Sequence, residues 1–600
     1  MLAKLWKAAQ VIFGVAVLLA AGPQQGFAGP PTSGPWEREW SEQLFARAAQ
    51  QKKLVLLDLE ARWCHWCHVM EEETYSNAQV AALLNKHFIL VRVDQDSRPD
   101  LSARYKEYGW PATILFNSKG EELEKLSGFQ SPEEFLPVLE ASIKDPRPKA
   151  ASSQPSASRA AILSSLPGDI REIAERDHLE AIDEDTGGLR TSHRYLDPDS
   201  VEYAITRARA GDARNRAWVT KTLDSNEKLI DPAWGGIYQY STHRDWDHPH
   251  FEKIMPSQMA NIRLYAYAYR VFGDERYLRD ARAVASYVNS FLRGPNGAYY
   301  TSQDADIVPG QHSDEYFSLD DAARRAKGVP AIDQHQYARE NGMAILAMTD
   351  LYLTTGEQEY LSAARGSAQW VLQNRLAESG GFRHGDDPAE APYLADSLWM
   401  ARGLLALYAA TGERPFLEQA RKTVSWISKE FANPDGAGFF ASSPSKAQVL
   451  KPVIRLDDNV ALARLANELF RYTGDEAFRA VAQKALSYVA QREVLEQSIS
   501  EPGVILAGEE IASDPPHFTV VGAKGDRAAQ ALFAVTRKVP ATYVRREWWD
   551  RAEGPMPNPD VQYPALPKAA GFVCANKRCS LPIFAGDELT SRIAQVFQAK

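Results

Sequence analysis

Cysteine is scarce in this chain of 600 residues, which has four: Cys64, Cys67, Cys574 and Cys579. Small secreted domains that depend on disulfides carry more cysteines in much shorter chains. A disulfide scaffold is therefore excluded, and each cysteine pair needs a local explanation. Because 44% of the residues are hydrophobic, the chain can bury large apolar cores instead, and its length predicts two or three domains.

Positive charge is also in short supply. The chain has 68 Lys and Arg against 78 Asp and Glu, a formal net charge of -10. No stretch or stripe rich in Lys and Arg stands out along the sequence. The charge balance therefore argues against a nucleic-acid partner.

Long apolar runs are missing, except for one near the start. Residues 8 to 21 form an apolar run after Lys4 and Lys7, and Gly26-Phe27-Ala28 offers a small-residue cleavage site. This layout is typical of a secretory signal peptide, and the run is short for a membrane span. We expect residues 1–28 to be removed, leaving a periplasmic or secreted protein with no stable membrane span. An uncleaved N-terminal anchor is the alternative.

Residues 36–145 alternate between apolar strand patterns and helical patterns. Strands are expected at residues 54–59, 88–93 and 113–116, with a fourth after the turn at 118–120, and helices follow the first two strands and the last. The order βαβαββα predicts an α/β thioredoxin-like domain. Residues 146–165 are rich in Pro, Ser and Ala, which predicts a linker.

Residues 166–515 are mainly helical and contain two repeated phrases. One has a Gly between two apolar-periodic helices, at Gly273, Gly356, Gly412 and Gly474, which predicts helical hairpins with a glycine cap. The other joins Gly to bulky apolar residues and occurs six times, beginning at residues 187, 235, 297, 380, 438 and 503. Six hairpins with uneven loops predict an all-α (α/α)6 toroid, with an open helical superhelix as the alternative. Residues 516–600 predict a small mixed α/β segment.

The pair Cys64 and Cys67 has the spacing of a redox-active Cys-X-X-Cys motif, and it directly follows a strand. A cysteine in the first turn of a helix has a lowered pKa, because unpaired N–H groups and the helix dipole stabilise its thiolate. We expect Cys64 to be the nucleophile and the more exposed of the two, and Cys67 to be the resolving thiol. His65 and His68 add positive charge or carry protons.

Two further residues fit this chemistry. Asp58, on the strand before the motif, is placed to accept the proton of Cys67 during resolution. Pro111 precedes the third strand, where a cis-proline would present backbone to a bound partner and exclude metal ligands.

Other interpretations of the motif stay open. Residues 64–68 also match the Cys-X-X-Cys-His pattern of haem c attachment, although the flanking strand speaks against a haem crevice. A zinc site and an inert disulfide are further alternatives. For Cys574 and Cys579 we favour a structural disulfide over a second redox pair that exchanges with Cys64. We expect no cofactor and no metal.

Residues 63–71, Trp-Cys-His-Trp-Cys-His-Val-Met-Glu, resemble the signature of the spermatogenesis-associated protein 20-like family. The resemblance extends to residues 246–253, 302–306, 456–458 and 573–580. It implies a thioredoxin-like domain followed by an (α/α)6 toroid, similar to N-acylglucosamine 2-epimerases and six-hairpin glycosidases. The first domain is also similar to the C-terminal domain of thiol:disulfide interchange proteins. Residues 186–195 and the loop from 306 to 315 depart from the family pattern, which weakens any inherited toroid activity.

Polar residues on the toroid loops suggest a second site. We expect them to converge on a central pocket that binds a glycan or sugar, or to act on one with acid and base groups; they are His248, His250, Glu252, Asp304, Asp306, Asp457 and Asp458. Helix capping and hydrogen bonds between loops would explain the same residues without a binding site. Two functions follow from the sequence. One is a thiol-disulfide oxidoreductase acting on a protein dithiol or disulfide partner, and the other is a carbohydrate-active or carbohydrate-binding toroid regulated by a thioredoxin-like domain.

Overall fold

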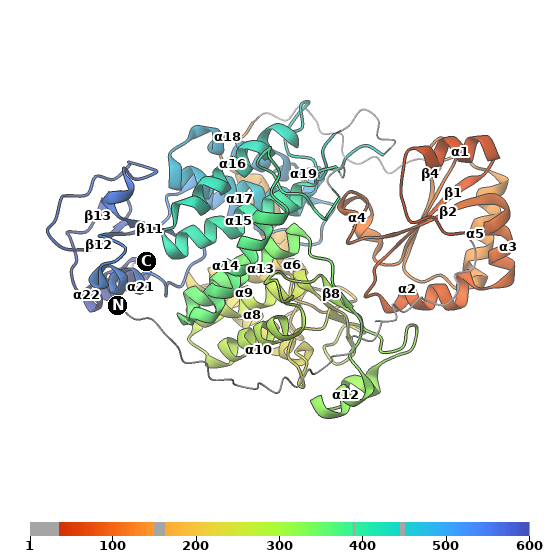
Figure 1. Cartoon of the computed structure of the whole chain (residues 1–600), viewed down its shortest axis with the longest axis horizontal. Coiled ribbons are helices and arrows are strands. Elements are labelled where there is room, and N and C mark those ends of the chain that lie inside the picture. The colour runs from red at the N-terminus through yellow and green to blue at the C-terminus, as the bar shows by residue number, and fades with distance from the viewer. Residues whose placement is uncertain (1–34, 149–161, 388–390, 445–449, 599–600) are drawn as a thin grey trace, which may run out of the picture.

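A computed structural model describes residues 35–148, 162–387, 391–444 and 450–598. Three parts lie in a row, with the N-terminal domain on the right of Figure 1, a ring of helices in the middle and a C-terminal domain on the left. The expected signal peptide and most of the expected linker lie outside the described residues. Within the described ranges, no helix has the length and hydropathy needed to cross a membrane.

The N-terminal domain is a four-stranded sheet of order β2-β1-β3-β4 between two pairs of helices. The strands are β1 (Leu54–Glu60), β2 (Phe88–Asp94), β3 (Ala112–Phe116) and β4 (Glu122–Ser127), and only β1 and β2 run parallel. Alternate strand residues face opposite ways. One face packs on α1 (Gln43–Gln51) and α4 (Pro99–Tyr105), and the other on α3 (Ala78–His87) and α5 (Pro132–Lys144). The thioredoxin-like prediction is confirmed.

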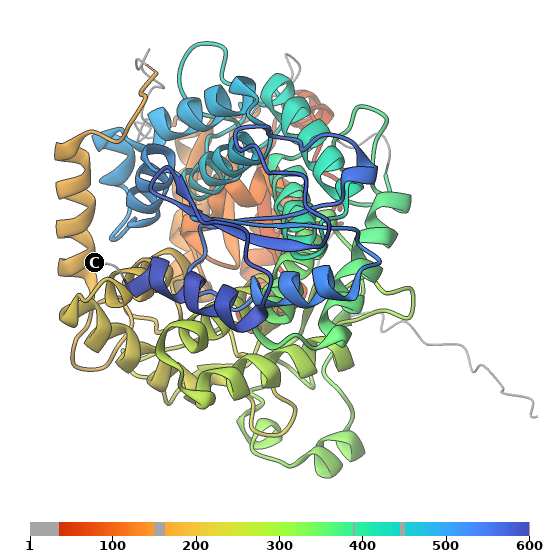
Figure 2. The ribbon, with the colours of Figure 1, turned by 90° about the vertical axis from the view of Figure 1, so that its left-hand side faces the viewer.

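Twelve helices form the ring, in an inner and an outer layer. The inner helices are α7 (Pro198–Arg209), α9 (Met255–Phe272), α13 (Ala338–Thr355), α15 (Leu394–Thr411), α17 (Leu456–Thr473) and α20 (Gly503–Ala512). The outer helices are α6 (Gly168–Ala181), α8 (Ala213–Asn226), α10 (Glu275–Phe291), α14 (Gln358–Asn374), α16 (Arg414–Glu430) and α18 (Glu476–Val489). Each inner helix contacts the next, and α20 contacts α7. The ring is therefore closed (Figure 2), and the open superhelix is excluded.

The glycine phrases explain how the chain turns between the layers. The four glycines predicted as caps have positive φ angles of 68° to 83°, which residues with a side chain adopt only at a cost. Five of the six Gly-apolar phrases form turns after outer helices, each closed by a single β-bridge. The sixth assignment is wrong, since Gly503 starts the inner helix α20. A side chain there would meet the Asp199 carboxylate, so this glycine allows α20 to approach α7.

Five hairpins follow one another along the chain, and the two ends of the helical region form the sixth pair, α6 with α20. The sequence phrases predicted six consecutive hairpins. Pairing the first helix with the last closes the ring without any further segment.

The C-terminal domain repeats the sheet plan of the N-terminal one. Its strands β10 (His517–Val521), β11 (Arg545–Trp549), β12 (Ala570–Ala575) and β13 (Arg578–Cys579) have the order β11-β10-β12-β13, and again only the first pair is parallel. Helices α21 (Arg527–Val535) and α22 (Gly586–Gln598) pack on it. Figure 2 shows this domain in front of one mouth of the ring, with the N-terminal domain behind the other.

Candidate active site

The cysteine pair lies where the sequence places it. After β1, Cys64 is the N-cap of α2 (His65–Val69), and its sulfur accepts a hydrogen bond from the Cys67 backbone N–H at 3.1 Å. The two cysteines form a disulfide. The peptide bond between Trp110 and Pro111 is cis, and Trp110 packs beside the pair. A thiolate on Cys64 would receive the free N–H groups of the first helical turn.

Cys64 is not exposed, which corrects the expectation that it is the more accessible cysteine. Its exposed fraction is 3%, against 6% for Cys67. Ring loops at residues 252–254 and 304–312, here called the cover, lie over the pair. Ile254 packs against the buried cluster that contains both cysteines, and the Ala305 N–H donates to the Trp63 carbonyl oxygen at 3.4 Å. The cover belongs to the ring. The prediction that Cys64 is exposed considered only its position at the start of a helix, and not the contact with a second domain.

Two histidines of the motif hold the cover through one aspartate. His65 Nδ1 donates to Asp306 Oδ1 at 2.8 Å, and His68 Nδ1 donates to Asp306 Oδ2 at 3.0 Å. Glu252 accepts from the His65 backbone N–H at 3.5 Å, and Asp304 lies 3.8 Å from His68 Nε2. Both imidazoles use Nδ1 for the hydrogen bond to Asp306. The second ring nitrogen of each, Nε2, takes no part in that contact.

Burial and charge shift the pKa values across this contact. Burial alone would lower the pKa of His68, but Asp306 and Asp304 outweigh it, so the pKa is raised. Burial acts against ionised Asp306, but its hydrogen bonds from His65 and His68 leave its pKa lowered. Burial raises the pKa of Asp304 to about 6 and that of Glu252 to about 7. The three acid groups of the cover therefore differ in pKa, because burial raises the values of Glu252 and Asp304 while hydrogen bonds from the two α2 histidines lower that of Asp306.

Asp58 lies in the middle of β1, 2% exposed, opposite Arg92 on β2. Arg92 Nε donates to Asp58 Oδ2 at 2.8 Å, and the same guanidinium pairs with Glu60 and Glu71. Burial raises the pKa of Asp58 in spite of Arg92. Asp58 can thus hold a proton inside the domain, as its expected role requires.

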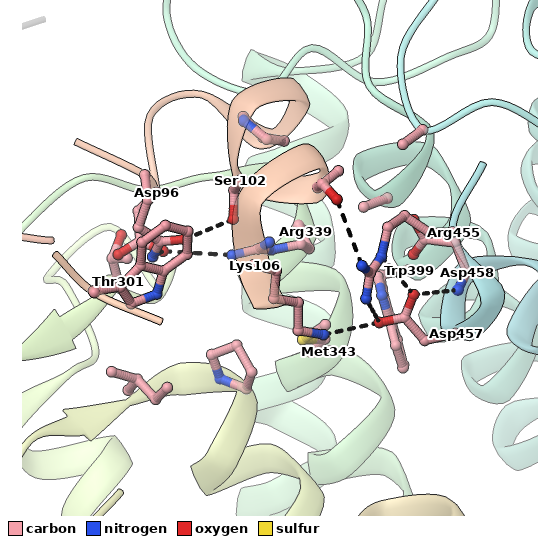
Figure 3. A pocket seen from close by; sticks show the side chains of 18 of the residues that line it. Asp96, Ser102, Lys106, Thr301, Arg339, Met343, Trp399, Arg455, Asp457 and Asp458 are labelled. Carbon is pink, nitrogen blue, oxygen red and sulfur yellow. Dashed lines mark hydrogen bonds and ion pairs between the residues drawn. The ribbon is translucent and has the colours of Figure 1, made fainter. Parts of the chain in front are cut away.

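A cavity of about 340 Å³ lies between the N-terminal domain and the ring (Figure 3). Trp63 and Trp110 form the wall nearest the cysteines, and Trp399 of α15 lies on the ring side. Lys106 Nζ, just after α4, reaches Asp457 Oδ2 of α17 at 2.9 Å across the cavity. We call it the interdomain cavity, because both domains supply its walls.

Asp457 and Asp458 are adjacent in this cavity but differ in charge state. Enclosure disfavours ionised Asp457, yet Lys106 and Arg455 hold its pKa well below the usual range. Burial and the neighbouring Asp457 raise the pKa of Asp458 to about 7. Two carboxyl groups with separated pKa values can serve as a charged group and a proton donor.

The seven predicted toroid residues do not meet in one pocket. Glu252, Asp304 and Asp306 lie against the cysteine motif, whereas Asp457 and Asp458 line the interdomain cavity. His250 stacks on Tyr240, with a ring separation of 4.5 Å, and burial and nearby His65 lower its pKa to about 4. His248 is exposed and pairs with Asp245.

His68, Asp304 and Asp306 are the one group among the described residues whose ligand atoms come within 4.8 Å of one another and could hold a metal ion. Asp306 already accepts hydrogen bonds from both histidines and from the Gly310 N–H at 2.9 Å. The Asp306 carboxylate thus has hydrogen-bond partners within the interface between α2 and the cover.

Several site residues escaped the sequence argument. Arg92 carried a usable signal, since a lone charge within the buried apolar strand 88–93 requires a buried partner. Lys106 and Arg339 carried none, because their partners Asp457 and Asp96 lie in another domain. Trp63 Nε1 donates to Asp96 at 2.7 Å, and Arg339 approaches the same Asp96 at 3.5 Å.

Comparison with known sequences gives two kinds of relative. Residues 34–134 match the Thioredox_DsbH family, described as a protein of unknown function, DUF255. Spermatogenesis-associated protein 20 of Homo sapiens is 22% identical over 91% of this chain and 88% of its own length. The thiol:disulfide interchange protein DsbD of Ralstonia nicotianae is 37% identical, over 14% of this chain and 15% of its own.

Among solved structures, a D-mannose isomerase matches 60% of this chain and 99% of its own, at 12% identity and a TM-score of 0.44. The closed ring itself is established by the helix contacts described above.

Proposed function

We propose that the chain belongs to the spermatogenesis-associated protein 20-like family and that it is a thiol-disulfide oxidoreductase whose reactive pair is Cys64 and Cys67. The observation that carries the proposal is the position of Cys64. It caps α2 at the end of the central strand β1, beside the cis-proline loop. The resemblance of this domain to a thiol:disulfide interchange protein supports it.

The reaction is thiol–disulfide exchange, written here as reduction of a partner. The Cys64 thiolate attacks one sulfur of the partner disulfide, and the partner's other sulfur leaves as a thiolate. Cys67 then loses its proton to Asp58 and attacks the Cys64 sulfur, which closes the Cys64–Cys67 disulfide and releases the partner as a dithiol. The same steps in reverse oxidise a dithiol partner.

The cover sets a condition on the partner. With Cys64 3% exposed, a protein disulfide reaches the sulfur only when the loops at 252–254 and 304–312 move away from α2. In the proposal the ring therefore controls access to the pair. The protein works outside the cytoplasm, where the signal-peptide pattern of residues 1–28 would deliver it. Cell fractionation with sequencing of the mature N-terminus tests this location.

Disulfide reduction by the full chain tests the activity, with Cys64→Ser as the variant and Cys574→Ser as the matched control. We expect the first to abolish reduction of a fluorescent disulfide substrate and the second to retain it. Equal rates for the wild type and Cys64→Ser would refute the proposal. A redox titration against glutathione, followed on Cys64 and Cys67 by alkylation, then gives the direction in which the pair operates.

A second function is favoured by the interdomain cavity. It combines three tryptophans, on which sugar rings stack, with the carboxyl pair Asp457 and Asp458. We propose that it binds a neutral or weakly charged sugar. A thermal-shift screen with sugars tests this proposal, with Trp399→Ala as the variant and Trp370→Ala, a partly buried tryptophan that does not line this cavity, as the control. Stabilisation that Trp399→Ala abolishes supports it, and no stabilisation by acylated hexosamines or common glycans refutes it.

A further inference from the structure

A second cavity lies inside the ring, at the mouth that the C-terminal domain covers (Figure 2). Its volume is about 80 Å³, which is room for several water molecules or one small oxyanion. The inner helices α9, α13, α15 and α17 and residues 541–546 enclose it. Five arginines line this arginine chamber: Arg263, Arg270, Arg402, Arg464 and Arg546.

Two of these arginines have carboxylate partners. Arg464 pairs with Glu202 at 2.6 Å and Glu510 at 2.8 Å, and Arg263 Nε donates to Asp350 at 2.8 Å. Their charges are thus compensated within the protein.

The other three arginines keep unpaired donors. Arg546 is 7% exposed, and its Nε donates to the Thr536 carbonyl oxygen at 2.9 Å, while no acceptor in the described ranges pairs with its terminal nitrogens. Arg402 lies over the Trp399 ring at 4.7 Å and makes no hydrogen bond or ion pair with a described residue. Arg270 Nη1 donates to Thr354 Oγ1 at 2.8 Å, while its Nε is buried without a described partner. Buried charges without partners are costly, so unpaired donors on three arginines that line one cavity call for an anion.

The remaining acid that lines the chamber, besides Asp350, is Glu468. Burial, and then the charge of Glu510, raises the pKa of Glu468 to about 7, so at neutral pH it is in part a neutral acid that can donate a hydrogen bond. Burial and the neighbouring arginines Arg263 and Arg464 lower the pKa of Arg402 to about 10. Burial lowers the pKa of Arg546 to about 10, with a further contribution from Arg270. Burial is the first cause of all three shifts.

We propose that the arginine chamber binds a small tetrahedral oxyanion, of the phosphate or sulfate class, through Arg546, Arg402 and Arg270. Guanidinium groups suit this ligand because their planar donors pair with two oxygens at once. Arg546 comes from the C-terminal domain, and the other two come from the ring. A bound oxyanion therefore joins the two, at the end of the ring opposite the cysteine pair, so this site is independent of the proposed redox function.

Thermal unfolding of the full chain with inorganic phosphate or sulfate tests the site, with sodium chloride at equal ionic strength as the reference. A ligand that binds only the folded state raises the melting temperature in a saturable way. We expect such a rise for the wild type with either oxyanion. Arg546→Gln and Arg402→Gln should weaken the apparent Kd at least about tenfold, since each removes a charge-assisted contact. Arg479→Gln, a surface arginine beside Glu476, is the matched control and should bind like the wild type.

Crystals of the wild type soaked in selenate provide a second measurement that does not depend on the variants folding. An anomalous peak in the chamber, together with loss of binding in the chamber variants alone, supports the proposal. No saturable rise above the chloride reference overturns it. An equal loss in Arg479→Gln, or an anomalous peak without any effect of the variants, also overturns it, because both indicate an adventitious ion only.

Discussion

The two ends of the molecule carry the same sheet plan and one disulfide each, but in different settings. In the N-terminal domain the bond joins Cys64, the N-cap of α2, to Cys67 one turn further in. In the C-terminal domain it joins Cys574 and Cys579, which face each other across the β12–β13 hairpin. The loop after β10, where a counterpart of Cys64 would stand, reads Gly-Ala-Lys-Gly-Asp and has no cysteine.

The comparison shows that the position of the cysteine in the fold, more than the fold itself, decides the chemistry. Cys64 receives N–H groups and the positive end of a helix, both of which favour a thiolate. Cys574 lies within a strand, where its backbone groups are paired, and Asn576 and Lys577 form the tight turn with positive φ angles between the two cysteines. The Cys574–Cys579 disulfide links the two strands of a hairpin, whereas the Cys64–Cys67 disulfide is placed to exchange with a partner thiol.

The largest predicted difference between the two pairs is in trapping a partner. Cys67→Ser removes the resolving thiol, so a mixed disulfide between Cys64 and a disulfide substrate should accumulate. The matching change Cys579→Ser should give no adduct above background. Non-reducing gels and mass spectrometry of the adduct check this. Adducts on Cys574 at a similar yield would mean that both pairs exchange and that the contrast is false.

The next effect concerns Asp58, which has no role at the second disulfide. Asp58→Asn should slow release of the mixed disulfide about 100-fold, the usual contribution of a proton acceptor, with little change in the first attack. Because the pKa of Asp58 is raised, release by the wild type should become faster as pH rises through that pKa, and the variant should show a flat profile. Stopped-flow measurement of both steps distinguishes this role from a structural one, which would alter stability but leave the pH profile in place.

Sequence reasoning succeeded where the determinant was local. A buried strand followed directly by Cys64 is enough to predict a helix N-cap, and a glycine after an apolar helix is enough to predict the caps at residues 273, 356, 412 and 474. It failed where the determinant was distant. His65 and Asp306 are 241 positions apart, and nothing in either segment encodes the other. The pattern at Gly503 was misassigned because a glycine followed by bulky apolar residues occurs both in a turn after an outer helix and at a close contact between two helices.

The cover should respond to pH, whereas the hairpin disulfide should not. The raised pKa of His68 means that its contribution to closure is present below its ordinary value of 6.5 and is lost as pH rises through the raised value. Asp304 and Glu252 act in the same direction, since ionising them above about 6 and about 7 opposes burial. The lowered pKa of Asp306 limits closure only in acid, because its contribution is lost as pH falls below its ordinary value of 3.8.

Alkylation of the reduced protein measures this closure, after correction for the thiolate fraction. Cys64 should react a few-fold faster at about pH 8 than at about pH 5.5, because the closed state loses the favourable charge pairs. Asp306→Asn, which leaves both histidines without their carboxylate, should raise the rate at about pH 5.5 roughly tenfold and abolish most of the pH dependence. Glu315→Gln, an exposed change three residues beyond the cover, should behave like the wild type. A pH dependence that persists in Asp306→Asn would exclude the histidine contact as its cause.

The smallest predicted effect on exchange comes from removing the second disulfide altogether. Replacing both Cys574 and Cys579 by Ser should leave the reduction rate within about twofold of the wild type, because neither residue takes part in exchange. The change should still lower the stability of the C-terminal domain by about 2 kcal/mol, since the bond closes a short loop. Denaturant unfolding followed by hydrogen exchange in β12 measures that loss, and the fluorescent disulfide assay measures the rate. If the rate falls as far as in Cys64→Ser while the N-terminal domain stays folded, electrons must pass between the two pairs, and the hairpin disulfide is then part of the redox pathway.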